Sequence, residues 1–119
     1  MKASRGEIKI HEILAQNNIN FKEEYEFAGL KAPSGRPLRF DFAIFDDDGN
    51  LDFLIEYQGK QHYQAVSKFG GNRGLYQQKY NDNQKRRFCA LKGITLVEIP
   101  YIDENIITYD YIMEKAHGW

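Results

Sequence analysis

Two β-rich runs separated by a turn constrain the fold of this chain most strongly. Residues 38–45 and 51–58 are dense in aromatic and branched side chains, which favour strands. Between them, residues 46–50 read Asp-Asp-Asp-Gly-Asn, a composition typical of a turn. The two runs therefore predict a β-hairpin.

Helices are expected on both sides of this hairpin. Ser4 and Glu7 have the spacing of a capping box, and apolar residues follow at helical spacing, so a first helix is expected from about residue 5 to residue 16. A second helix is expected from about residue 75 to residue 91, with Gly93 placed to end it.

Two further strands and a last helix complete the expected elements. Aromatic and charged residues alternate between positions 21 and 27, which predicts a half-exposed strand before the hairpin. Residues 94–99 form a short apolar strand ended by Pro100. Asp103 or Asn105 is expected to cap a final helix.

The expected order is α-β-β-β-α-β-α, which predicts an α+β fold with a mixed central sheet of about four strands flanked by helices. The strand after the long helix must return beside the hairpin by a crossover. Residues 61–74 are Gly-rich and polar, so a mobile loop is expected there. Without repeats or a linker, residues 1–119 are expected to form one domain.

Composition narrows the classes of function. Apolar residues make up 42% and charged residues 28% of the 119 residues, as in soluble globular proteins. No apolar run is long enough to cross a bilayer, so a cytoplasmic protein without a membrane partner is expected. Cys89 is the only cysteine, which excludes an internal disulfide and a cysteine-rich zinc site. A net charge of −1 argues against binding nucleic acid by bulk charge alone.

Two acidic residues interrupt the apolar hairpin strands. Alternation places Phe40, Phe42 and Ile44 on one face of the first strand, and Asp41 on the other face. The same face of the second strand is expected to carry Glu56. Two such carboxylates repel by roughly a few kcal/mol at an effective dielectric of about 20. The pair therefore calls for a cation, and Mg²⁺ or Mn²⁺ with oxygen ligands is suited to phosphodiester hydrolysis.

An alternative is that both acids are ordinary surface residues, satisfied by Arg39 or Lys60. The run 55–62 favours a site, because the apolar strand ends in a cluster of polar residues around a glycine rather than in a simple turn.

These residues resemble the motif of the PD-(D/E)xK nuclease superfamily, an Asp on one strand followed by Asp or Glu, any residue and Lys on the next. Asp41 matches the first acid and Glu56 the second, while Gln58 stands where Lys is usual, a departure also found among restriction enzymes. The resemblance covers nearly the whole chain. It implies a restriction-endonuclease-like fold and an Mg²⁺- or Mn²⁺-dependent endodeoxyribonuclease, with Asp41, Glu56 and Gln58, or its carbonyl, holding the metal.

Within that superfamily the chain is more similar to very-short-patch-repair endonucleases and to phage homing endonucleases of the E-D-x-H-D pattern. Glu7, Asp41, His62 and Asp82 match the four positions, whereas Asn81 replaces a frequent His. The resemblance implies proton-handling and water-orienting roles for His62, Glu7 and Asp82. Glu7 is equally explained by the capping box, and His62 by an ordinary surface position.

One face of the second helix is expected to meet the acids. Gln78, Asp82 and Lys85 share this face, with Arg86 beside them. Lys85 or Lys60 then replaces the missing motif Lys as the electrostatic partner of the transition state. The alternative is an exposed helix face with a surface pair between Asp82 and Arg86.

Double-stranded DNA is the expected partner, with a homodimer or two successive nicks needed to break both strands. An aromatic residue in the Gly-rich loop, Phe69, is expected to wedge or stack at DNA. Two other readings remain: a non-catalytic nucleic-acid-binding module with a decayed nuclease fold, and a structural or assembly protein. The expected phosphate-tracking rim consists of Lys31, Arg36, Arg39, Lys68, Arg73, Lys79, Lys85 and Arg86.

Overall fold

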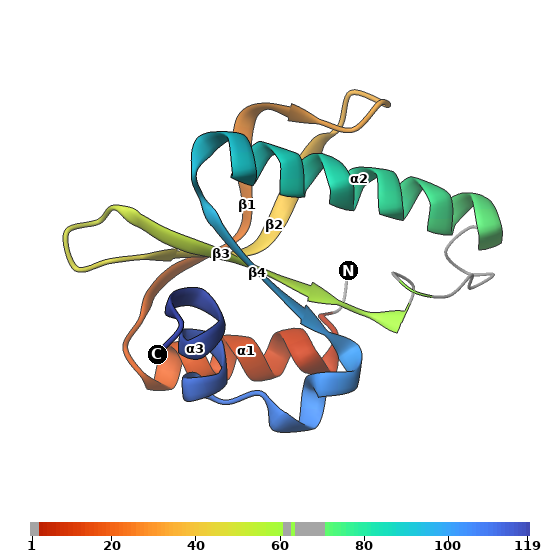
Figure 1. Ribbon diagram of the computed structural model, residues 1–119. Helices are drawn as coiled ribbons and strands as arrows, with labels where there is room; N and C mark the ends of the chain where they lie inside the picture. Colours follow the sequence, from red (N-terminus) through yellow and green to blue (C-terminus); the bar gives the residue numbers. More distant parts are fainter. Residues whose placement is uncertain (1–2, 61–62, 64–70) are drawn as a thin grey trace.

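Helices and strands follow one another in the order that the sequence predicts. The structure is a computed structural model that describes residues 3–60, 63 and 71–119. A 3₁₀ helix, η3, precedes the last helix in addition to the expected α-β-β-β-α-β-α order (Figure 1). The elements are α1 (Arg5–Gln16), β1 (Asn20–Lys31), β2 (Pro37–Phe45), β3 (Leu51–Gln58), α2 (Gly71–Lys92), β4 (Thr95–Pro100), η3 (Tyr101–Ile106) and α3 (Tyr109–His117).

The strands form a four-stranded mixed sheet in the spatial order β1-β2-β3-β4. The pairs β1–β2 and β2–β3 are antiparallel, whereas β4 lies parallel to β3. Parallel pairing requires a crossover, and α2 provides it. The predicted α+β fold, the hairpin and the returning strand are thereby confirmed.

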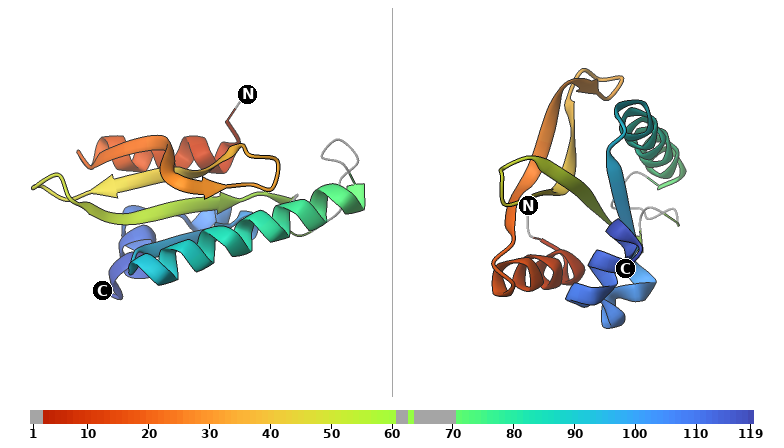
Figure 2. Two further views of the ribbon diagram at one scale, coloured as in Figure 1. Left: turned by 90° about the horizontal axis from the view of Figure 1, so that it is seen from above. Right: turned by 60° about the vertical axis from the view of Figure 1, so that its left-hand side comes forward.

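The two faces of the sheet are covered by different helices, as Figure 2 shows. On one face, Ile10 of α1 and Ile112 of α3 pack with Ile55 of β3 in a buried apolar cluster. On the other face, Cys89 of α2 packs with Leu54 of β3 in a second cluster. Since both faces are buried, β3 is mostly apolar from Phe53 onward, and the side chains of Glu56 and Gln58 near its end are enclosed.

The side chains of β2 change face at Asp41, which corrects the predicted alternation. Phe42 and Ile44 pack in the cluster under α1 and α3, but Phe40 packs with Ala43 in the cluster under α2. Regular alternation would put Phe40 with Phe42. The reason is that the pairing of β2 with β3 stops at Phe42 opposite Ile55, so the remainder of β2 turns away from β3.

Two predicted boundaries are wrong. α2 begins at Gly71 rather than near residue 75, so residues 71–74 are helical and not part of a loop. Their poor helix propensity costs little there, because the first N–H groups of any helix lack intrahelical acceptors. α3 is capped by Thr108, whose side chain accepts the Tyr111 N–H at 3.0 Å, and not by Asp103 or Asn105.

Asp103 and Asn105 are unsuited to cap α3 because both lie within η3. The Asp103 carboxylate instead accepts a hydrogen bond from the Tyr111 hydroxyl at 2.6 Å. The rest of the predicted mobile loop, 61–62 and 64–70, lies outside the described residues.

Candidate functional site

Asp41 and Glu56 lie side by side where β2 and β3 diverge. One position beyond the last strand partners, Glu56 Oε2 accepts the backbone N–H of Asp41 at 2.9 Å. Asp41 Oδ2 in turn accepts the backbone N–H of Tyr57 at 2.7 Å. The carboxylates therefore take the place of backbone carbonyls in the ladder, which fixes both acids between the strands.

The buried face of α2 meets Glu56 through Lys85. Lys85 Nζ donates to Glu56 Oε1 at 2.5 Å, and both side chains are nearly enclosed. The same ammonium lies 5.5 Å from the centre of the Phe40 ring. Asp82, one turn earlier on α2, is also buried and accepts a hydrogen bond from Gln78 Nε2 at 3.1 Å. Gln78, Asp82 and Lys85 thus face the sheet rather than solvent.

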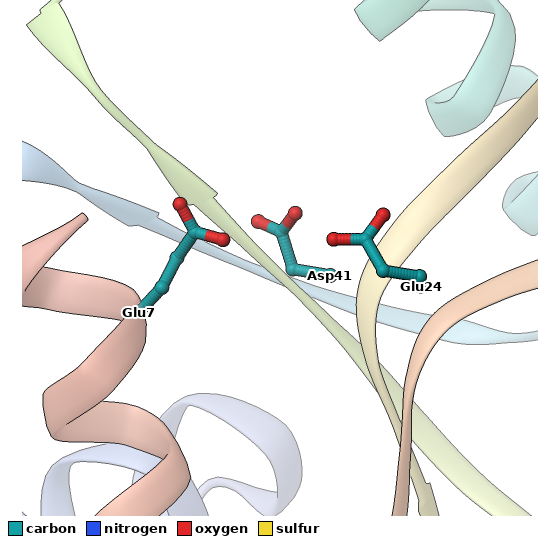
Figure 3. Close-up of side chains that lie close together, drawn as sticks. All are labelled: Glu7, Glu24 and Asp41. Atoms are coloured by element: carbon teal, nitrogen blue, oxygen red, sulfur yellow. The ribbon is translucent and has the colours of Figure 1, made fainter. Parts of the chain in front are cut away.

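A second group of acids gathers on the other side of Asp41. Glu7, Glu24 and Asp41 each offer a carboxylate oxygen, and within the described part of the chain these three oxygens lie within 4.8 Å of one another. Figure 3 shows the three side chains in a row, Glu7 from α1, Asp41 from β2 and Glu24 from β1. Glu24 lies between the paired residues Glu23 and Tyr25 of β1, whose partners Phe42 and Phe40 flank Asp41, and it has a left-handed backbone, with φ of 52°.

The start of α1 is positioned by two local contacts. The Ser4 side chain accepts the Glu7 N–H at 3.2 Å and donates to Glu7 Oε1 at 2.9 Å, within a complete capping box. Gly6 lies directly on the ring of Tyr57, and a Cβ there would be 2.1 Å from Tyr57 Cζ. This close approach, which only glycine allows, brings Glu7 to the end of β3 and next to Asp41.

The three acids open into a cavity of about 420 Å³ between α1 and the first two strands. His11, one helical turn after Glu7, lines the same cavity and its Nδ1 contacts Glu23 of β1. The sequence analysis missed both Glu24 and His11. His11 could have been found from its i, i+4 spacing with Glu7, and Glu24 from the pairing of β1 with β2, which brings residues 23–25 opposite residues 40–42.

Burial dominates the electrostatics of the paired acids. Desolvation, together with the neighbouring charge of Glu56, raises the pKa of Asp41 to about 8. Burial also raises the pKa of Glu56, although the Lys85 ammonium opposes that shift. Closely spaced carboxylates that resist ionisation favour an added cation, because the cation repays the cost of charging them.

Gln58, at the position of the motif Lys, is turned away from the acid cluster towards β4. Its Nε2 donates to Glu98 Oε1 at 2.9 Å, and its Oε1 accepts the Tyr63 hydroxyl at 2.7 Å. Glu98 also accepts from Arg86 Nε at 2.7 Å. The amide of Gln58 thus bonds to Glu98 and Tyr63, away from the clustered acids.

The expected basic rim is dispersed. Arg39 is paired with Glu26 at 2.8 Å and Arg86 with Glu98, so both guanidinium groups face carboxylates. Lys79 lines a separate 240 Å³ pocket beside Gln58. Lys31, Arg36, Lys60 and Arg73 are exposed. His62, Lys68 and Phe69 lie outside the described residues.

The chain is similar to several viral proteins. It is 37% identical over 93 residues to the uncharacterized protein 307L of Invertebrate iridescent virus 6, covering 76% of this chain and 47% of that protein. It is 39% identical over 90 residues to the uncharacterized protein 094L of Frog virus 3, covering 73% and 56%. It is 44% identical over 106 residues to the uncharacterized protein 033L of Invertebrate iridescent virus 3, covering 82% and 50%.

The chain thus spans about half the length of the curated relatives it matches. No family model matches it, and no solved structure matches it. Within residues 3–60, 63 and 71–119, none of the helices combines the length and apolar character needed to cross a membrane.

Proposed function

We propose that this protein is a metal-dependent endodeoxyribonuclease. The observation that carries the proposal is the convergence of Glu7, Glu24 and Asp41, from three different elements, beside the buried pair of Glu56 and Lys85. Converging acids can hold a metal ion, and a neighbouring buried lysine can offset negative charge. A site that hydrolyses phosphodiesters needs both.

The residues present fit a hard divalent cation. The three clustered ligands are all carboxylate oxygens, the donor type that Mg²⁺ and Mn²⁺ prefer. Both oxygens of Glu56 already accept hydrogen bonds, from the Asp41 amide and from Lys85. We therefore assign the metal to Asp41, Glu7 and Glu24, with Glu56 as the residue that positions Asp41. When bound, the cation would polarise a phosphate oxygen and ease ionisation of an attacking water.

The other side chains have complementary tasks. Lys85 holds Glu56 in place and offsets the negative charge that accumulates when a phosphate enters. His11 lies in the same cavity, and its contact with Glu23 orients the imidazole as a carboxylate orients a catalytic histidine. We propose that His11 is a proton-transfer group. It would take the role of the His that is frequent in E-D-x-H-D nucleases and that Asn81 replaces in this chain.

The proposed substrate is double-stranded DNA, and the proposed place of action is inside the cell. A single site of this size cuts one strand at a time, so a double-strand break requires two copies of the chain or two successive nicks.

Asp41→Asn tests the proposal, because it keeps the shape of the side chain and removes its charge. We expect nicking of supercoiled plasmid in Mg²⁺ or Mn²⁺ to fall by about 100-fold or more, as for loss of a metal ligand. Asp47→Asn, in the exposed hairpin turn, is the matched control and should cleave as wild type. Unchanged cleavage by a folded Asp41→Asn protein would sink the proposal.

A second function is favoured by one observation, the engagement of Gln58 with Glu98 and Tyr63 rather than with the acids. A DNA-binding module that has lost catalysis would have this feature. Calorimetry separates the two: a decayed site should bind no Mn²⁺ at millimolar concentration, whereas a nuclease site should bind it and lose it in Asp41→Asn.

A further inference from the structure

A groove separate from the acid-lined cavity lies between the tip of the β1–β2 hairpin and α2. Its volume is about 450 Å³, with hairpin residues 32–34 on one side and Tyr76, Tyr80 and Asn81 of α2 on the other. Figures 1 and 2 both show the hairpin tip beside this part of α2. None of these residues takes part in the proposed metal site.

Two tyrosines line the helix side of the groove. Tyr76 and Tyr80 are four residues apart on α2, so their rings lie on the same side of the helix. Tyr76 is 75% exposed and Tyr80 44% exposed, so neither ring serves the core. Adjacent exposed rings on a rigid helix are suited to stacking against a planar aromatic ligand.

The wall of the groove carries an unsatisfied acceptor. Asn81 lines the groove, and its Oδ1 is buried without a hydrogen-bond donor among the described residues. A buried acceptor without a donor is costly, and the broad χ2 torsion of asparagine lets the amide turn towards a donor in the groove. A planar ligand with N–H groups along its edge matches this wall, and every nucleobase has that chemistry.

Charge and position connect the groove to the proposed site. Exposed Lys31 and Arg36 flank residues 32–34 on the hairpin, where they would face the phosphates of a bound nucleotide. On the helix, Asn81 is followed directly by Asp82, and one turn later Lys85 contacts Glu56. α2 therefore lines the groove and also reaches the proposed site, so that a strand of DNA bound at the acids could continue to the groove.

We propose that this groove binds an unpaired nucleobase, stacked on Tyr76 and Tyr80 and paired with Asn81. The proposal rests on the proposed nuclease function and specifies its substrate class: DNA with an unpaired base, as in a gap, a mismatch or a flap. A base within continuous duplex would first have to leave the stack, which weakens its binding.

The test is a titration of the protein, in EDTA so that no cleavage occurs, with fluorescein-labelled duplexes that are either continuous or carry a short gap. We expect wild type to bind the gapped duplex more tightly. Tyr76→Ala/Tyr80→Ala should bind the gapped duplex about tenfold more weakly, as for loss of a base–aromatic stack, and the continuous duplex almost unchanged. Replacing the unpaired nucleotides opposite the gap by abasic sites should weaken binding by wild type to a similar extent. Binding by the alanine variant should become no weaker.

Two controls separate stacking from general effects. Tyr76→Phe/Tyr80→Phe keeps both rings and should keep the preference for the gap. Trp119→Ala removes a ring that is 77% exposed elsewhere on the surface and should bind as wild type. Circular dichroism checks that each variant is folded.

Equal binding of the gapped duplex by wild type and the alanine variant, or a wild-type preference for continuous duplex, would overturn the groove assignment. Plasmid nicking by wild type would then still support the nuclease. Conversely, a tyrosine-dependent gap preference without any nicking would support the groove and count against the nuclease.

Discussion

Asp41 makes the stability of the protein depend on pH in a direction opposite to that of most acids. Its folded pKa of about 8 lies above the usual 3.8, so the folded state binds the proton more tightly than the unfolded state. The contribution of Asp41 to the free energy of unfolding is complete below about pH 4 and is lost as the pH rises through 8. Glu56, whose pKa is also raised, acts in the same direction.

We therefore expect the metal-free protein to lose stability between pH 4 and pH 8, and Asp41→Asn to lose less. Urea unfolding in EDTA across this range measures both profiles. The reason is that asparagine has no charge to be desolvated when the pH rises. Parallel profiles for wild type and Asp41→Asn would show that Asp41 is ionised in the folded state throughout.

Lys85 is the counter-charge on which the burial of Glu56 depends. Lys85→Met should lower the free energy of unfolding at neutral pH by about 3 kcal/mol or more, since it leaves a buried carboxylate without a partner. Denaturant unfolding measures the loss. Glu56→Gln/Lys85→Met, which removes both charges, should recover most of the lost stability. A Lys85→Met protein as stable as wild type would contradict the ion pair.

At the scale of elements, α1 depends on Gly6 for its position against β3. Gly6→Ala places a Cβ against the Tyr57 ring, so we expect a loss of about 1–3 kcal/mol in stability and weaker metal binding as Glu7 moves away. Urea unfolding and Mn²⁺ calorimetry measure the two effects. In Gly6→Ala/Tyr57→Leu the smaller leucine leaves room for the new methyl group. The loss of stability in this double variant should therefore be smaller than the sum of the losses in the two single variants.

Elements that are specified locally could be predicted from the sequence. The capping box of α1 and the turn between β2 and β3 are written in adjacent residues, and both are present. The start of α2 and the cap of α3 were predicted wrongly. At α3 the hydrogen bond from the Tyr111 hydroxyl engages Asp103, one of the predicted caps, whereas the first turn of α2 has poor helix propensity and so gives no local signal for a helix start.

The candidate site could be predicted only in part, for a similar reason. Period-two alternation brings Asp41 near Glu56, but it also places Phe40 on the wrong face, because alternation assumes a regular ladder. The ladder is irregular at Asp41 itself. Glu24 was missed because its carboxylate joins the cluster through a backbone conformation that glutamate rarely adopts.

At the scale of the whole molecule, a bound cation should act as a stabiliser. A ligand that binds only the folded state stabilises it by about 2.7 kcal/mol at 100 times its Kd. For a domain of this size that corresponds to a rise in Tm of about 10 °C. We expect this rise with Mg²⁺ or Mn²⁺, measured by thermal unfolding at matched ionic strength.

The matched variants locate the effect. Asp41→Asn should show no cation-dependent rise in Tm, whereas Glu114→Gln, which alters an exposed acid on α3, should keep it. A rise of equal size in Asp41→Asn would mean that the cation binds elsewhere on the molecule.

The backbone at Glu24 implies a conflict between durability and activity. Glycine adopts a φ of 52° without the penalty of roughly 1 kcal/mol that a side chain incurs there, so Glu24→Gly would make the metal-free fold more robust. It would also delete one of the three acids that converge on the proposed metal. A laboratory selection for heat resistance alone would therefore favour glycine at this position, and its most stable products would have lost an acid of the proposed metal site.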